Sequence, residues 1–355
     1  MKIVLFDEIN ETHVCDALAT GLDDLGHAVF RTGPVWKGHA FATSPEAIAS
    51  IDARIDEALA AGPDWWLNFR ASSLTAGQVE RIRRAGVRAA VWFPDDPVLY
   101  ELCYSKIVDA YDLVLHCGGR QVLDFYRYRG HRIGINFPFW VDLRAWPLRY
   151  EPDACDRGPV FYGNMHGVAK RSRYEALCAV APDVSLYGRL ADDPLVRGRG
   201  VLNGPHEAAA ALPRHRLGLN APQRFADYAG SAYDFAGLAL LGTFFLPSRV
   251  VQYAALGLPT LTLHAGAVVD AGHYPPGLHA RDVAQARAVV ERISVQPDLL
   301  RGISLAARGD VERFHTGGSR ARLLAALFDG TIEPERLTPH EQEFGYRFFC
   351  DAPTA

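Results

Sequence analysis

The sequence predicts an α/β protein of two domains, each built around a parallel β-sheet. The chain has 355 residues, which is enough for two hydrophobic cores. Short apolar strand segments alternate with helical segments in both halves, a pattern typical of parallel sheets that helices cover on both faces. Each half is therefore expected to form a Rossmann-like domain.

The expected elements of the first half come in strict alternation. The strands are expected at 2–6, 27–31, 65–68, 88–93, 112–116 and 132–136, and the helices at 11–25, 45–61, 75–85, 98–110 and 120–129. A polar stretch with a proline, 149–158, indicates a linker.

The second half begins again with a strand at 159–162. Further strands are expected at 184–187, 217–220, 242–245 and 260–263, and helices at 169–180, 281–293, 297–308, 319–328 and 340–349. We therefore assign one domain to residues 1–148, a second to 149–332 and a C-terminal segment to 333–355.

Composition disfavours several classes of protein. The formal net charge is −4, so bulk electrostatics gives no attraction to nucleic acid. No apolar run approaches the ~20 residues of a membrane-spanning helix, and the first residues predict a strand instead of a signal peptide. The six cysteines are scattered without a Cys-x-x-Cys pair and are expected to be reduced. We expect a cytoplasmic protein without a membrane span.

The most informative segment runs from Phe245 to Thr262. It predicts a short apolar helix with Ser248 as its N-cap, followed by a left-handed stop at Gly257 and a buried strand. Arg249 and Gln252 are the polar residues of this apolar helix. Buried polar side chains need partners, and here the partner could be a ligand, unless the segment is an ordinary core helix.

This segment resembles the nucleotide-sugar motif of GT-B glycosyltransferases, with Gln252 where those enzymes carry an acidic ribose-binding residue. The stretch 138–147 resembles the segment that crosses between their domains. The resemblance covers the whole chain and implies two Rossmann-like domains facing across a cleft. It implies acceptor binding by residues 1–148, nucleotide-sugar binding by 149–332, and a segment at 333–355 that packs back on the first domain.

A second motif, Trp92 to Pro97, looks like the Trp-x-x-Asp-Asp-Pro signature of the spore-maturation-type glycosyltransferase family. A carboxylate here would face the cleft and take the proton of an acceptor hydroxyl as general base. Adjacent residues cannot both point one way, so either Asp95 or Asp96 is the candidate, and Asp-Pro turn capping is the alternative role. His13 is a third candidate base, or else a surface histidine of a helix.

The loop that follows the strand at 159–162 predicts a phosphate site. Gly163 and Asn164 begin it, and a helix N-terminus followed by Lys170, Arg171 and Arg173 ends it, which suits a diphosphate leaving group. We favour Arg171, with Lys170 second; a solvated basic helix face is the alternative.

Further donor contacts are expected where other strands end. Tyr187 and Gly188 form a turn of the kind that related proteins place near the nucleotide base. Asn220 ends a strand at the carboxyl edge, where α/β sheets bind ligands. With Ser248, Arg249 and Gln252 they complete the expected donor site.

The resemblance implies a metal-independent hexosyltransferase without a cofactor beyond its nucleotide-diphosphate sugar. The acceptor would be a small molecule, a glycan or a protein. Many retaining enzymes carry a Glu-x7-Glu pair, and the position eight before Gln252 is Phe244, so inversion is favoured. Alternatives are an epimerase or hydrolase on the same fold and a non-catalytic nucleotide-sugar-binding module. The balanced charge disfavours a DNA-modifying glycosyltransferase.

Overall fold

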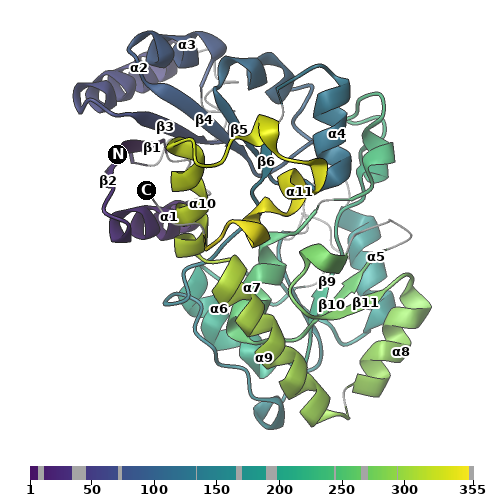
Figure 1. Ribbon diagram of the computed structural model, residues 1–355. Helices are drawn as coiled ribbons and strands as arrows, with labels where there is room; N and C mark the ends of the chain where they lie inside the picture. The colour runs from purple at the N-terminus through teal and green to yellow at the C-terminus, as the bar shows by residue number, and fades with distance from the viewer. Residues whose placement is uncertain are drawn as a thin grey trace. The chain divides into compact units, whose positions relative to one another are not determined.

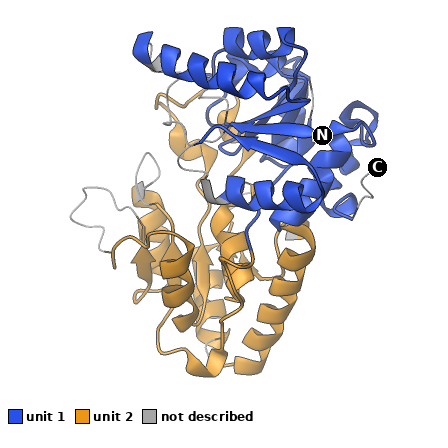
Figure 2. Ribbon diagram, turned by 90° about the vertical axis from the view of Figure 1, so that its left-hand side faces the viewer, with its two compact units in different colours: residues 1–142, 316–355 blue, residues 143–315 orange. Residues whose placement is uncertain are grey.

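The computed structural model describes residues 1–6, 12–33, 45–70, 74–132, 134–164, 170–188, 198–243, 245–264, 271–293 and 295–351. Figure 1 labels the elements, and Figure 2 colours the two compact units into which the chain divides. The first unit comprises residues 1–142 and 316–355, and the second comprises 143–315.

The first unit is built on a parallel sheet whose described strands have the order β2-β1-β3-β4-β5-β6. The strands are β1 (Lys2–Phe6), β2 (Ala28–Arg31), β3 (Trp65–Phe69), β4 (Arg88–Phe93), β5 (Leu113–His116) and β6 (Ile135–Asn136). The α-helices are α1 (Thr12–Asp24), α2 (Pro45–Ala60), α3 (Ala76–Arg84), α4 (Arg120–Tyr128), α10 (Gly317–Phe328) and α11 (Pro339–Phe348). Every residue of β3 is buried, as a sheet covered on both faces requires.

Helices α1 and α10 lie side by side because glycines let their backbones approach (Figure 1). A Cβ atom on Gly21 would lie 2.7 Å from the carbonyl oxygen of Gly317, and one on Gly317 would lie 2.0 Å from that of Ala17. The Trp65 ring stacks on Phe328 at 4.0 Å, and its Nε1 donates to the Phe328 carbonyl at 3.0 Å. Helix α10 therefore completes the core of the first unit.

The last helix, α11, packs against β6 of the same unit. The Asn136 side chain donates to the Glu343 carbonyl at 3.0 Å, and the Gly345 backbone abuts Ile135. The units thus divide after residues 142 and 315, whereas the sequence placed the boundaries after 148 and 332. The difference at the second boundary arises because α10 packs on α1 instead of continuing the helical layer of the second unit.

The second unit has a parallel sheet whose described strands have the order β11-β10-β9-β7-β8. The strands are β7 (Val160–Tyr162), β8 (Ser185–Tyr187), β9 (Gly218–Asn220), β10 (Thr260–Leu263) and β11 (Leu278–Ala280). The α-helices are α5 (Lys170–Val180), α6 (Pro205–Ala211), α7 (Ser248–Leu256), α8 (Val283–Ile293) and α9 (Pro297–Phe314). Because β8 and β9 flank β7 on opposite sides, the topological switch point of this sheet lies at the carboxyl ends of β7 and β9.

The structure corrects two expected elements. Residues 98–110 form turns and two short 3₁₀ segments, Tyr104–Lys106 and Val108–Ala110, because their aromatic side chains pack into the core on an irregular backbone. The expected strand at 242–245 is absent from its described residues: Gly242 has a φ of 83°, and Thr243 forms one isolated bridge with Arg224. Helix α6 and strand β11 were not predicted. Within the described ranges, no helix is long and apolar enough to cross a membrane.

Candidate functional site

Helix α7 carries the motif that the sequence singled out. Its predicted C-cap is confirmed, since Gly257 is left-handed with a φ of 78°, and β10 follows as expected. The predicted N-cap is wrong: Ser248 is already helical, and the cap residue is Pro247, which makes no side-chain hydrogen bond. The second residue of this helix, Arg249, therefore lies in its first turn, beside the carboxyl edge of the sheet.

Arg249 joins the ends of β7 and β9. Its Nε donates to the Tyr162 carbonyl at 2.9 Å, and its Nη1 donates to the Asn220 side-chain oxygen at 3.0 Å. The guanidinium carbon lies 4.7 Å from the centroid of the Phe161 ring. A Cβ atom on Gly163, where φ is 152°, would lie 2.8 Å from Arg249 Nη2. Glycine at 163 thus admits a guanidinium to this edge.

A second arginine, Arg173 of α5, lies beside the same ring. Its guanidinium carbon is 5.6 Å from the Phe161 centroid, and its Nη1 donates to the Asn164 carbonyl at 3.1 Å. Arg173 is 8% exposed. It lies one helical turn before the buried Leu177 and two turns before the buried Val180, so it shares the inward face of α5.

We call Arg173 and Arg249 the arginine pair, and its electrostatics are unusual. No carboxylate of the described ranges forms an ion pair with either guanidinium. The negative charge of Asp227 raises the pKa of Arg173, but this carboxylate forms its ion pair with Arg224, at 2.6 Å. Burial and, to a smaller extent, the nearby charge of Arg249 lower the pKa of Arg173 to about 9. Burial also lowers the pKa of Arg249. Arginine side chains stay protonated in proteins, so the pair holds two positive charges that a bound anion would stabilise.

The other predicted residues of the α5 region lie differently. The Arg171 side chain is 67% exposed and pairs with Glu175 at 2.9 Å, on the solvent face of the helix. The inward basic residue of α5 is therefore Arg173 instead of the favoured Arg171. Lys170 begins α5, but its side chain lies outside the described part of the chain. Asn164 is exposed, and its carbonyl accepts from Arg173.

The end of β8 and the middle of α7 supply three more predicted residues. The Tyr187 hydroxyl accepts from Arg157 at 3.1 Å, and Arg157 precedes β7, so this hydroxyl points toward the amino end of the strands. A Cβ atom on Gly188 would lie 2.1 Å from the Gly163 carbonyl oxygen, so these two glycine backbones pack together at the carboxyl edge. Gln252, three residues after Arg249 on α7, is buried with 7% exposed.

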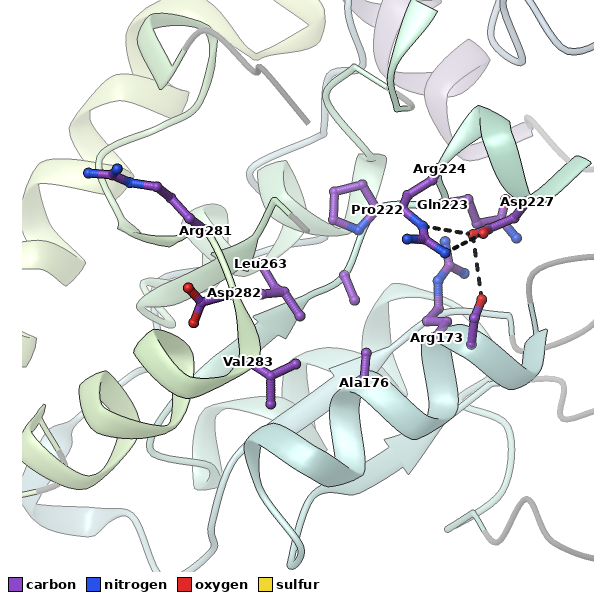
Figure 3. Close-up of a pocket in the computed structure, with 12 residues that line it drawn as sticks. Arg173, Ala176, Pro222, Gln223, Arg224, Asp227, Leu263, Arg281, Asp282 and Val283 are labelled. Carbon is purple, nitrogen blue, oxygen red and sulfur yellow. Dashed lines mark hydrogen bonds and ion pairs between the residues drawn. The ribbon is translucent and has the colours of Figure 1, made fainter. Parts of the chain in front are cut away.

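A cavity of about 480 Å³ opens next to Arg173 (Figure 3). Its walls come from α5, the segment after β9, the end of β10 and the start of α8. Figure 3 shows Arg173 beside the Arg224–Asp227 ion pair at one end of this space, with Leu263 and Val283 on its apolar side. The volume lies within the range of small-molecule sites.

In the first unit, the structure separates the two adjacent carboxylates after β4. Asp96 is buried with 1% exposed, and both of its oxygens are engaged: Oδ2 contacts His116 Nδ1 at 2.6 Å, and Oδ1 accepts from the Tyr126 hydroxyl at 2.7 Å. The Asp95 side chain is 36% exposed and pairs with Arg70 Nη2 at 2.6 Å. Asp96 thus fixes the loop, and Asp95 is the carboxylate that solvent reaches.

The remaining candidate base, His13, lies in the first turn of α1, and its side chain is outside the described residues. In the parts of the chain that are described, no group of three or more His, Cys, Asp or Glu side chains is arranged to hold a metal ion.

Sequence reasoning noted Arg173 but preferred Arg171 and Lys170, and it missed Arg70 and Tyr126. A signal existed for Arg173, because its spacing from Leu177 and Val180 places it on the apolar face of α5. Arg70, directly after β3, contacts Asp95, and Tyr126 of α4 contacts Asp96. No local sequence pattern predicts such long-range contacts.

Comparison with known proteins identifies the fold. No family model and no curated protein matches this sequence. Among solved structures, Anabaena HepE in complex with UDP and glucose is similar at a TM-score of 0.61 and 11% identity, over 93% of this chain and 100% of that one. A glycosyltransferase from Rickettsia africae is similar at 0.58 and 11% identity, over 93% and 98%.

A UDP-N-acetylglucosamine 2-epimerase is also similar, with a TM-score of 0.53 and 14% identity, over 95% of this chain and 99% of that one. Two units with parallel sheets, matched over nearly the whole length by these structures, define a GT-B fold, as predicted. At these identities the likeness establishes the fold alone.

Proposed function

We propose that this protein is a glycosyltransferase that moves a sugar from a nucleotide-diphosphate sugar to an acceptor hydroxyl. The observation that carries the proposal is the arginine pair: two cations at the switch point of the second sheet, Arg173 buried and Arg249 half-buried, without a carboxylate partner among the described residues. Uncompensated buried charge is unfavourable, and a diphosphate would compensate it. The HepE structure contains UDP, which agrees with this ligand class.

The donor would lie across the ends of β7 and β9. Arg173 and Arg249 would hold the diphosphate, with Lys170 of the α5 N-terminus as a further cation. Asn220, fixed by Arg249, and Gln252 offer amide groups for ribose or sugar hydroxyls. The cavity beside Arg173 gives room for the part of the donor that adjoins the diphosphate.

The proposed chemistry is a direct displacement at the anomeric carbon. The acceptor oxygen forms a bond to that carbon, the bond from that carbon to the phosphate oxygen breaks, and its electron pair leaves with the diphosphate. The arginine pair stabilises the charge that develops there, which assigns no task to a metal ion. Asp95 takes the acceptor proton, since Asp96 has both oxygens engaged within the protein. Such a single displacement inverts the anomeric configuration.

Two finer assignments belong to the same proposal. The Trp92–Pro97 motif supports membership of the spore-maturation-type group of glycosyltransferases. The acceptor is a small molecule, a glycan or a protein.

A thermal-shift screen tests the donor assignment. The protein is heated with UDP, GDP, dTDP, ADP and CMP and with their sugars, and the unfolding midpoint is recorded. A ligand that binds only the folded state raises the midpoint; at 100 times its Kd it adds about 2.7 kcal/mol. A rise with one diphosphate and its sugars is expected. No rise with any of them, at millimolar concentrations, refutes the proposal.

An epimerase is the second candidate, because an epimerase shares the fold. The two functions differ in their need for an acceptor. Under the proposal, nucleoside diphosphate is released from the donor much faster when an acceptor hydroxyl is supplied. Conversion of the donor without any acceptor, followed by NMR of the sugar, would favour the epimerase.

A further inference from the structure

Arg70 has a backbone conformation that its residue type rarely adopts. Its φ is 75°, and it is the one non-glycine residue with a positive φ in the described part of the chain. It directly follows β3, and its N–H donates to the Trp92 carbonyl at 2.9 Å, which extends the ladder between β3 and β4 by one bond. Left-handed geometry is unfavourable for an arginine, so the surrounding structure must hold it there.

The side chain of Arg70 explains what this conformation achieves. It is 4% exposed, and its Nη2 lies 2.6 Å from Oδ2 of Asp95, whose side chain is 36% exposed. The pair therefore joins a rigid, buried cation to a carboxylate at the surface of the first unit. A charge-assisted bond of this length fixes the carboxylate more tightly than a neutral one would.

The neighbouring carboxylate, Asp96, is held in place by other residues. Asp96 is held by His116 and by Tyr126, all three buried. The backbone of the loop is thereby anchored independently of Arg70. Removing the arginine would leave the loop anchored but release the Asp95 side chain.

We propose that Arg70 is the positioning residue for Asp95. Its left-handed backbone directs the guanidinium to one carboxylate oxygen, so that the other is presented to the acceptor hydroxyl. This role rests on the proposed function, because it presumes that Asp95 takes the acceptor proton. A displacement of about 1 Å in a reacting group can lower a rate ~100-fold, so an ion pair that holds Asp95 in position would affect the rate strongly.

The test uses Arg70→Gly, because glycine adopts a positive φ without strain. The backbone turn is kept, and only the side chain is lost. The Asp95 carboxylate is partly solvated, so no buried charge is stranded. We expect donor binding, measured by the thermal shift, to be unchanged, and the rate of nucleoside diphosphate release with acceptor to fall about 10- to 100-fold. Arg70→Lys should lie between the wild type and Arg70→Gly, because lysine keeps the charge without the planar fork.

The control is Arg81→Gln, which removes an arginine of the same unit that is 40% exposed and pairs with Asp52 on the surface. Its rate should equal that of the wild type. The double variant Arg70→Gly with Asp95→Asn distinguishes positioning from general destabilisation. If Arg70 acts through Asp95, the double variant is no slower than Asp95→Asn alone.

The outcomes separate this inference from the function on which it rests. A wild type that binds no donor and releases no diphosphate refutes the proposed function, and this role for Arg70 with it. An active wild type with an equally active Arg70→Gly variant overturns the role of Arg70 alone. Multiplicative losses in the double variant also overturn it, since they would mean that the two residues act independently.

Discussion

Replacing Arg173 by methionine should stabilise the free protein and abolish its response to a nucleoside diphosphate. Burial, with a smaller contribution from the Arg249 charge, lowers the pKa of Arg173 from the ordinary arginine value to about 9. At 1.36 kcal/mol per pH unit, holding this charge in the folded protein costs roughly 5 kcal/mol. Since pH 7 lies below both values, the side chain is charged in both states there, and the full cost applies.

The net gain should be smaller than this cost. The hydrogen bond to the Asn164 carbonyl and the contact with Phe161 offset part of it in the wild type. Apolar replacements of buried charges stabilise proteins by about 1–4 kcal/mol, and we expect a gain within that range. The cavity beside Arg173 leaves space for a methionine to adjust.

The assay is the thermal unfolding midpoint with and without the diphosphate found in the screen. Wild type should show a rise with ligand; Arg173→Met should show a higher midpoint without ligand and no rise. The matched control is Arg171→Met on the same helix, exposed and paired with Glu175. It should change stability by less than about 0.5 kcal/mol and keep the ligand response. If Arg171→Met instead abolishes the response and Arg173→Met keeps it, the phosphate site is on the outer face of α5 and this reasoning fails.

Three further predictions concern other parts of the molecule. Asp95→Asn should lower turnover ~10²- to 10⁴-fold with donor binding intact, whereas Asp96→Asn should mainly lower the free energy of unfolding, by about 2–3 kcal/mol; equal effects of both on turnover would contradict the assignment. Gly163→Ala should weaken diphosphate binding about tenfold in calorimetry, because its Cβ would displace the Arg249 guanidinium; unchanged affinity would place the phosphates elsewhere. Burial lowers the pKa of His264 from 6.5 to about 4, so between these values the unfolded chain takes up a proton that the folded one does not. Stability should therefore be full above pH 6.5 and fall as the pH drops toward 4, more steeply than in His264→Gln; parallel melting curves for both would contradict this.

The alternation of elements could be predicted because hydrophobic pattern is local information. Three elements were predicted on that basis: the strand from Lys2 to Phe6, the strand from Thr260 to Leu263, and the helix that precedes the C-cap Gly257. The irregular segment 98–110 was predicted as a helix because its apolar spacing fits one. Only the packing of its aromatic side chains into the core decides otherwise, and that packing depends on the rest of the sheet.

The candidate site was predictable in place but not in detail. Carboxyl ends of parallel strands bind ligands, which located Asn220 and the Gly163 loop. Which of two adjacent side chains points inward depends on partners far away in the sequence. Asp95 pairs with Arg70, whereas Asp96 contacts His116 and Tyr126, and these partners give the two carboxylates different roles. No local pattern in the loop distinguishes Asp95 from Asp96.

Both units contain, at the carboxyl end of their sheet, a feature that lowers the stability of the folded protein. In the first unit this feature is the left-handed backbone of Arg70, and in the second it is the desolvated charge of the arginine pair. Neither feature is needed to build a parallel sheet, since glycine at 70 and an apolar residue at 173 would serve the fold better. Departures from local preference of this kind are typical of functional sites. Both features lie at the edge where α/β sheets bind ligands. Arg70 lies next to Asp95, the carboxylate of its loop that solvent reaches, and Arg173 lies next to a cavity of about 480 Å³. Because these destabilising features lie where α/β sheets bind ligands, we infer that Arg70 and the arginine pair are kept for binding or catalysis instead of for stability.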